Sequence, residues 1–299
     1  FNNSSINTIY SLTYLERYYT LSGISRSFNA TYRETNAARA DLADYDIAAL
    51  NLGVGFSVPL NEEDSIQFGL AFEQLELTLG SRAAQYVQEF VDTNGDRFSF
   101  IKGTLGWVRD SRDRAIFPTS GGRQQVSGEV ALPGSDLEFY KLNYSHRRYW
   151  PLARYLTFSL NLGLGYGDGY GSSSELPFFE NFYAGGISSV RGYRGNSLGS
   201  RDERGDPKGG NARIVGGTEL IFPMPFVEAE SLRMALFLDG GSVYDTRDKI
   251  DLGELRYSAG VGLIWLSPLG ALTFSLAEPL NDRPGDRTQV FQFSLGSLF

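Results

Sequence analysis

The chain has 299 residues, with 35 Asp and Glu against 27 Lys and Arg (a formal charge of -8), one histidine and no cysteine. The lack of cysteine excludes disulfides, Cys-based zinc or iron–sulfur sites and thiol catalysis, and the acidic balance argues against a nucleic-acid binder. Aromatic residues (14%) and glycines (35) are abundant, and no apolar run approaches the roughly 18–20 residues of a membrane helix.

One pattern repeats along the chain, in which apolar residues alternate with small or polar ones. Such alternation predicts β-strands with one apolar face. About thirteen strands are predicted, near residues 5–15, 20–33, 45–58, 65–79, 97–109, 123–132, 137–149, 154–167, 212–222, 232–243, 255–266, 271–278 and 289–299. A soluble β-sandwich would alternate in the same way, but strands of about ten residues that repeat to the C-terminus are more typical of a membrane barrel. The predicted fold class is all-β, a transmembrane antiparallel β-barrel.

The connections between these strands fall into two alternating sets. One set is short (16–19, 59–64, 151–153, 223–230 and 267–270), apart from a long connection at 110–122. The other set is longer and charged (34–44, 80–96, 168–211, 244–254 and 279–288), apart from a short connection at 133–136. Outer-membrane barrels have short periplasmic turns and longer outer loops. The short turns and the C-terminal Phe299 are therefore predicted on the periplasmic side.

An odd number of strands is unusual, because bacterial single-chain barrels close with an even number. Phe1 stands just before a strand, with neither an initiator Met nor a signal segment. We therefore expect that at least one strand, with three as the preferred number, precedes Phe1 in a longer protein.

The connection 168–211 carries two recognisable segments. They are Pro177–Gly186, which reads PFFENFYAGG, and Val190–Tyr193, which reads VRGY. Both resemble the signature loop of the BamA family, the central barrels of the outer-membrane protein assembly machinery. Family members carry Phe where this chain has Tyr193. The resemblance extends over essentially the whole chain, including GYGDG at 165–169, LSPLG at 266–270 and the closing strand 291–299.

This resemblance implies a sixteen-stranded barrel with the long loop folded into its lumen. Residues 1–299 would form the barrel domain, without the periplasmic POTRA domains and the first strands. The resemblance also implies that the loop arginine bonds to acidic residues on the barrel wall, here Arg191 with Glu219 and Asp239. The predicted loop site consists of Val190, Arg191, Gly192, Tyr193, Glu219 and Asp239.

The phase of the strands agrees with this site. Leu220 and Leu238 fall on the lipid face of their strands, so the neighbouring Glu219 and Asp239 point inward. Two carboxylates on adjacent strands can hold one guanidinium through charge-assisted hydrogen bonds that lysine cannot reproduce. Without the resemblance, Arg191 would be interpreted as a solvated loop charge.

The last strand is predicted to form one side of a lateral seam, as the family resemblance implies. The residues assigned to it are Phe291, Phe293, Leu295, Gly296 and Phe299. Gly296 lacks a side chain and weakens the strand locally, which suits a seam that opens. An aromatic C-terminus resembles the targeting signal of outer-membrane barrels in general, so by itself it predicts only a barrel.

No enzyme, cofactor or metal ion is expected. His146 shares the lipid-facing side of its strand with Tyr144, where an aromatic-girdle position is favoured over catalysis. The stretch Asp92–Asp96 resembles a fragment of a calcium loop but lacks the downstream Glu.

The resemblance implies a protein of the Gram-negative outer membrane that folds and inserts other outer-membrane proteins through the seam. The implied partners are unfolded outer-membrane proteins, accessory assembly lipoproteins (mainly through the periplasmic domains), and outer-membrane lipid and lipopolysaccharide, with no nucleic acid. Two relatives stay open as alternatives, a two-partner secretion transporter and an autotransporter-assembly protein. A passive porin would need no such loop motif.

Overall fold

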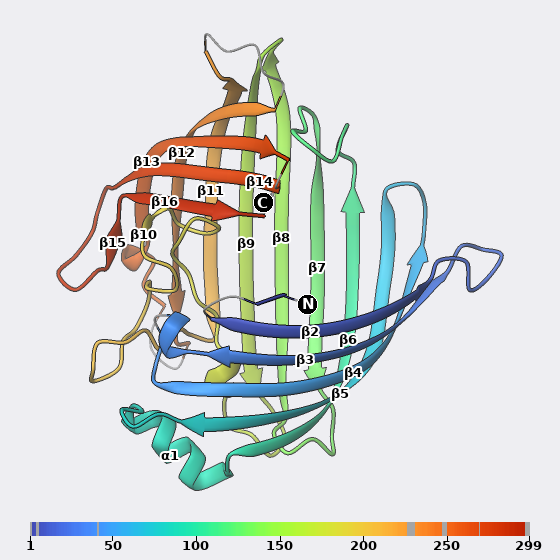
Figure 1. Ribbon diagram of the computed structural model, residues 1–299, viewed down its shortest axis with the longest axis vertical. Helices are drawn as coiled ribbons and strands as arrows, with labels where there is room; N and C mark the ends of the chain where they lie inside the picture. Colours follow the sequence, from blue (N-terminus) through green and yellow to red (C-terminus); the bar gives the residue numbers. More distant parts are fainter. Residues whose placement is uncertain are drawn as a thin grey trace.

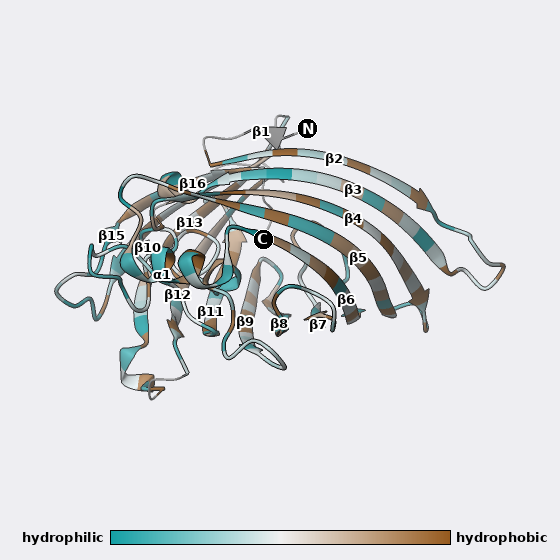
Figure 2. Cartoon of the chain, turned by 90° about the horizontal axis from the view of Figure 1, so that it is seen from below, coloured by the Kyte–Doolittle hydropathy of each residue, from teal (hydrophilic) through white to brown (hydrophobic). Residues whose placement is uncertain are grey.

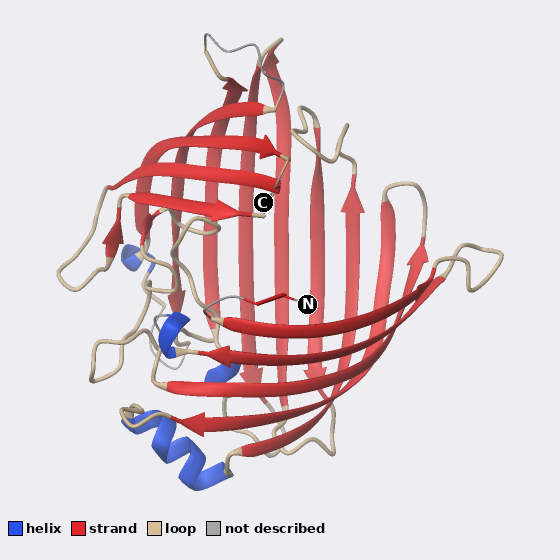
Figure 3. Ribbon diagram, in the orientation of Figure 1, coloured by secondary structure: helices blue, strands red, loops and turns tan. Residues whose placement is uncertain are grey.

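Alternating apolar residues build long antiparallel strands in the computed structural model of the chain, which describes residues 2–3, 6–40, 42–225, 231–246, 250–268 and 270–296. The main sheet has 14 strands in the order β1-β2-β3-β4-β5-β6-β7-β8-β9-β11-β12-β13-β14-β16, and neighbours pair in antiparallel register (Figures 1 and 3). Since β1 has only two residues, the other strands number thirteen, as predicted.

Most bounds of the main-sheet strands lie within two residues of the predicted ranges, but β3 is shifted three to five residues toward the C-terminus and β8 ends four residues later than predicted. The bounds are β1 Asn2–Asn3, β2 Asn7–Glu16, β3 Ser25–Asn36, β4 Tyr45–Pro59, β5 Asp64–Leu79, β6 Arg97–Asp110, β7 Gly121–Ala131, β8 Phe139–Ala153, β9 Leu156–Gly169, β11 Ala212–Pro223, β12 Leu232–Tyr244, β13 Arg256–Ser267, β14 Gly270–Pro279 and β16 Phe291–Leu295. A second, two-stranded sheet joins β10 Gly192–Tyr193 to β15 Thr288–Gln289.

The main sheet curves into an arch whose two ends do not meet within the described residues (Figure 2). Its outward face is apolar and exposed, for example at Leu12 (75% exposed), Leu105 (63%) and Leu276 (58%). Exposed apolar residues on every second position are what a lipid-facing strand presents. His146 stacks on Tyr144 with ring centroids 6.4 Å apart, on the outward face that the sequence predicted.

One helix departs from the predicted all-β chain. Helix α1 (Gln85–Asn94) forms inside the connection 80–96, which was predicted only as a longer, charged connection between strands. Its apolar residues recur at helical spacing, so that Val87 is fully buried and Phe90 packs edge-on against Phe178 at 5.1 Å. Gly95 ends the helix with a φ of 86°, so the Asp92–Asp96 stretch straddles a helix end. None of the helices in the described residues is long and apolar enough to cross a membrane.

The long connection 168–211 packs inside the arch, beside the inward faces of the strands (Figure 1). Three short 3-10 helices occur in the described chain, Ala38–Ala40, Phe178–Glu180 and Leu252–Glu254, and the second lies in this loop. An apolar cluster of the loop with the wall contains Phe182, Ala184, Val190, Tyr193, Leu198 and Val243. The predicted loop in the lumen is confirmed.

Candidate functional site

Arg191 lies between two carboxylates of the sheet. Its Nε donates to Asp239 Oδ2 at 2.6 Å and its Nη2 to Asp239 Oδ1 at 2.7 Å. Its Nη1 lies 2.8 Å from Glu219 Oε1, and its guanidinium stacks over the Phe237 ring at 3.5 Å. The structure thus brings together the three charged residues that the sequence analysis assigned to this site. We call Arg191, Glu219 and Asp239 the Arg191 cluster.

The Arg191 cluster is almost sealed from solvent. The side chains of Arg191, Glu219 and Asp239 are 6%, 9% and 2% exposed. Burial alone would lower the pKa of Arg191, but the hydrogen bonds and charges of Asp239 and Glu219 raise it, so the guanidinium stays charged. The bidentate geometry depends on the planar fork of arginine, which a lysine ammonium does not offer.

The two residues after Arg191 join the loop to the C-terminal strands. Gly192 pairs with Gln289, and Tyr193 pairs with Thr288. The Tyr193 carbonyl also accepts a hydrogen bond of 2.7 Å from Gln292 Nε2, on β16. The loop tetrad therefore touches the strand that the sequence analysis assigned to a seam.

Gly192 is a position that strongly favours glycine. Its φ of +87° is a conformation that L side chains rarely adopt. An added Cβ would lie 3.2 Å from the Cβ of Ala277 and 3.3 Å from that of Ser258. The third residue of the tetrad is thus required for close approach of the loop to β13 and β14.

Apolar packing and inward glycines accommodate the rest of the loop. Val190 and Tyr193 are fully buried. Gly165 faces Phe182, whose ring carbon would lie 2.7 Å from a Cβ at that position, and Gly167 faces Leu176 at 3.1 Å. The inward glycines of β9 therefore leave the space that the loop occupies.

A second charged cluster attaches the loop to the wall, and the sequence analysis missed it. Glu180 lies 3.0 Å from Lys102 Nζ and 2.9 Å from Lys141 Nζ. Lys102 also lies 2.9 Å from Glu73 and 3.5 Å from Glu129. We call these five residues the Glu180 cluster. Burial would raise the pKa of Glu180, but the charges of the two lysines outweigh burial and lower its pKa to about 2.

A signal for the Glu180 cluster was present in the strands. Glu73, Lys102, Glu129 and Lys141 are charged, fall on four successive strands and alternate in sign. Glu129 and Lys141 are direct cross-strand partners, a pairing that stabilises antiparallel sheets. What gave no signal was Glu180 itself, because a loop residue has no strand phase.

The predicted seam strand is present as the edge strand β16. Phe291, Phe293 and Leu295 are 52%, 67% and 60% exposed, and point outward. Gly296 follows the strand with a φ of +92°, so it stands at the end of β16 instead of inside it. Phe299 lies outside the described residues. Within the described chain, β16 pairs with β14 alone, which leaves one edge of β16 without a strand partner.

Comparisons with known proteins agree with this geometry. A family model described as the Omp85 superfamily domain matches residues 1–299. The chain is 36% identical to the outer membrane protein assembly factor BamA of Neisseria meningitidis, over 97% of this chain and 41% of that protein. It is 32% identical to the sorting and assembly machinery component 50 homolog of Mus musculus, over 64% of this chain and 44% of that protein.

A solved structure shares the fold. The crystal structure of BamA from Haemophilus ducreyi lacking POTRA domains 1–3 has a TM-score of 0.89 and 29% identity, and the match covers 97% of this chain and 62% of that one. The family resemblance predicted from the loop motifs is therefore confirmed. The chain spans about two fifths of the length of the curated bacterial relative.

Proposed function

The chain belongs to the Omp85 superfamily, and from this premise we propose that it is the membrane barrel of an assembly factor that folds and inserts outer-membrane proteins. It is an integral protein of the outer membrane, as the apolar outward face and the named outer-membrane relatives indicate. We further propose that residues 1–299 are the barrel domain of a longer protein, and that the protein is not an enzyme.

The observation that carries this proposal is the connection between the inner loop and the edge strand. Gly192 and Tyr193 pair with β15, and Gln292 of β16 donates to the Tyr193 carbonyl. An edge strand offers unpaired N–H and C=O groups to another strand. The loop tetrad is therefore in a position to hold the edge strand in place while that edge is available.

The proposed mechanism follows from the cost of unpaired backbone in lipid. Each unsatisfied backbone group costs several kcal/mol in the hydrocarbon layer. An incoming strand that pairs with the β16 edge satisfies these groups by β-augmentation. Local thinning of the bilayer beside this edge would lower the barrier further. A mechanism of this kind makes and breaks hydrogen bonds and no covalent bonds.

The proposed partners are unfolded outer-membrane proteins, as the similarity to an outer membrane protein assembly factor supports. Accessory lipoproteins are proposed to bind mainly outside residues 1–299, and lipopolysaccharide to contact the outer loops. Both charged clusters hold the loop against the wall inside the arch, and this position of the loop argues against an open pore.

The test reconstitutes the full-length protein in proteoliposomes and follows the folding of an unfolded eight-stranded barrel by its gel-mobility shift. Folding well above that in empty liposomes is expected, and loss of most of the acceleration is expected for Arg191→Ala. Arg109→Ala is a matched control, because Arg109 pairs with Glu63 at 2.9 Å and is 51% exposed, away from the loop.

Two outcomes would contradict the proposal. No acceleration with accessory lipoproteins present would favour the secretion transporter instead. Full activity after covalent crosslinking of β16 to its neighbour across the seam would show that the edge does not open.

A further inference from the structure

The connection 110–122, the long exception among the short turns, encloses a cavity with the inner wall of the sheet. The cavity has a volume of about 290 Å³ and lies between residues 112–119 of this connection, the turn residues Arg154 and Tyr155, and residues of β8, β9, β11, β12 and β13. The short turns are periplasmic in outer-membrane barrels. The cavity therefore lies at the periplasmic end of the lumen.

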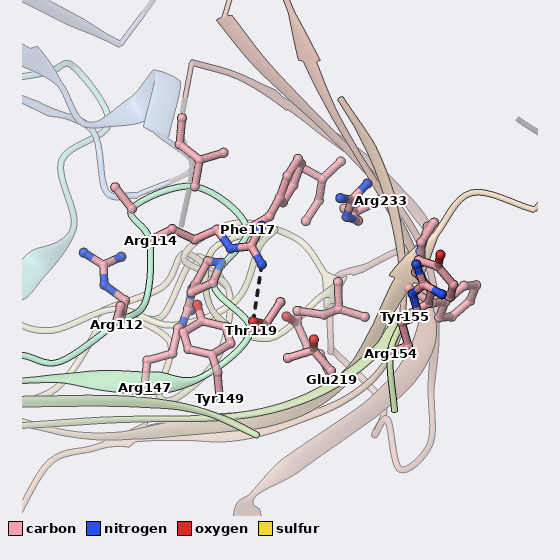
Figure 4. A pocket seen from close by; sticks show the side chains of 18 residues that line it. Arg112, Arg114, Phe117, Thr119, Arg147, Tyr149, Arg154, Tyr155, Glu219 and Arg233 are labelled. Atoms are coloured by element: carbon pink, nitrogen blue, oxygen red, sulfur yellow. Dashed lines mark hydrogen bonds between the residues drawn. The ribbon is translucent and has the colours of Figure 1, made fainter. Parts of the chain in front are cut away.

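The lining of this cavity is strongly cationic. Five arginines and one carboxylate line it, namely Arg112, Arg114, Arg147, Arg154, Arg233 and Glu219. Arg112, Arg114 and Arg147 lie on one side and Arg154 and Arg233 on the opposite side, with Glu219 between them (Figure 4). Glu219 also pairs with Arg191 at 2.8 Å, so it is the one carboxylate of the lining and is shared with the Arg191 cluster.

The arginines differ in how their charge is balanced. Asp110 holds Arg112 through two bonds of 2.8 and 2.6 Å, and Asp113 lies 3.2 Å from Arg114. Arg154 makes no ion pair with a described residue, and its guanidinium lies 5.1 Å from the Tyr155 ring centre. Arg154 is an exposed residue of the turn between β8 and β9, so its charge stands at the mouth of the cavity, open to a ligand from solvent.

The connection is built to hold this shape. The Asp113 carboxylate accepts hydrogen bonds from the backbone N–H groups of Thr119 (2.9 Å) and Ser120 (3.1 Å). Phe117 has a φ of +50°, which is an outlier for a bulky side chain and is found where surrounding structure enforces it. Its ring lies 4.9 Å from the Arg233 guanidinium. The strained backbone thus presents an aromatic ring beside a cation at the cavity.

Apolar side chains form another part of the lining, beside the polar Thr119, Thr157, Tyr149 and Tyr155. Ile116, Phe117, Ile221, Phe222 and Ile264 contribute to it. A cavity of about 290 Å³ is at the small end of ligand pockets. It has room for one group of amino-acid size and none for a folded segment or a lipid tail.

We propose that this cavity binds a carboxylate carried on an apolar or aromatic group of amino-acid size. The carboxylate is held by Arg154 and its neighbouring arginines through charge-assisted hydrogen bonds, and the apolar group lies against Phe117 and Ile221. Such a group occurs both in free aromatic acids and at the end of a polypeptide that enters from the periplasm. Binding can be measured without assembly activity, so the proposal succeeds or fails separately from the proposed function.

The test uses the protein in phospholipid nanodiscs and the probe N-acetyl-4-fluoro-L-phenylalanine, observed by fluorine NMR line broadening. Saturable binding of the acid is expected, with the neutral amide of the same probe at least about tenfold weaker, as for the loss of one charge-assisted hydrogen bond. Equal binding of the acid and the amide would overturn the proposal.

Variants distinguish binding in the cavity from a general effect of the protein's net charge. Arg154→Gln and Phe117→Gly are each expected to weaken binding of the acid at least about tenfold. The control is Arg17→Gln, which removes the same charge from an exposed residue of another short turn. Each variant is first checked for folding by heat-modified gel mobility. Binding of the acid to a folded Arg154→Gln protein at wild-type strength would also overturn the proposal.

A competition experiment identifies the source of the carboxylate. A tripeptide ending in phenylalanine with a free carboxylate is compared with its amidated form. Displacement of the probe by the free-carboxylate peptide alone supports a polypeptide end as the occupant. Displacement by free aromatic acids without displacement by the peptide supports a small acid, and displacement by neither overturns the site.

Discussion

The loop 168–211 is attached to the wall in two places, and the two attachments use opposite arrangements of charge. In the Glu180 cluster, one loop carboxylate lies between two wall lysines, one of which has two further carboxylates within 3.5 Å. In the Arg191 cluster, one loop cation lies between two wall carboxylates and forms a bidentate pair with Asp239.

This difference in charge arrangement predicts how each attachment responds to the loss of one charged side chain. Lysine is a compact charge on a flexible stem, and Lys102 keeps Glu73 and Glu129 if Glu180 is lost. The Arg191 cluster has no such substitute, because both carboxylates depend on one guanidinium. We therefore expect the first attachment to be robust and the second to be indispensable.

The largest effect is expected for Arg191→Ala. The change leaves Asp239 and Glu219 buried without their cation, which costs about 3–5 kcal/mol for a buried pair. Urea unfolding in phospholipid vesicles and protease sensitivity of the loop measure it. Arg191→Lys is expected to recover only part of the loss, since the bidentate geometry is gone. If Arg191→Ala left both the unfolding free energy and the proteolysis pattern unchanged, the Arg191 cluster would not be the indispensable attachment of the two.

A smaller effect is expected for Glu180→Gln. About 1–3 kcal/mol should be lost, as for removal of one partner of a charged hydrogen bond, because Lys102 retains two carboxylates. The matched control is Glu76→Gln, since Glu76 pairs with Arg97 at 2.8 Å but is 48% exposed, and surface pairs contribute about 0–1 kcal/mol. A loss equal to that of Arg191→Ala would show that the first attachment is not redundant.

The contribution of Glu180 should also depend on pH. Its pKa falls from 4.5 to about 2 in the folded protein, so the stability it contributes is present above pH 4.5 and is lost as the pH falls toward 2. The difference in unfolding free energy between wild type and Glu180→Gln should therefore be constant above pH 4.5 and shrink as the pH falls from 4.5 to about 2. A difference that grows as the pH falls would reverse the assigned sign.

The smallest effect is expected for Tyr193→Phe. The Tyr193 hydroxyl donates to the Tyr257 carbonyl at 3.3 Å, and loss of one such bond costs about 0.5–1.5 kcal/mol. The ring stays fully buried, so the packing is retained. Urea unfolding of Tyr193→Phe and of Arg191→Ala under the same conditions compares the two positions directly. A loss of unfolding free energy in Tyr193→Phe larger than that in Glu180→Gln would contradict the expected order of effects.

The strands and the direction of their side chains could be predicted from the residues alone. Alternation with a period of two is a local property, so the residues within one run are enough to predict a strand and its two faces, as in β9 and β12. The same phase placed Glu219 and Asp239 on the inward face, and the family motif singled out Arg191 as their partner. Because β11 and β12 are paired neighbours in the sheet, Glu219 and Asp239 lie close enough to contact the same arginine.

Apart from the contact of Arg191, the positions of the loop residues against the wall became visible only in the folded protein. Helix α1 forms because its apolar side lies against Phe98 and Phe178, and Phe178 is a residue of the distant loop. Glu180 meets Lys102 across 78 residues, and the cavity at 110–122 takes its lining from several separate segments. Irregular segments carry no repeating pattern, so their positions depend on shape and charge complementarity that exists only once the sheet has curved around them.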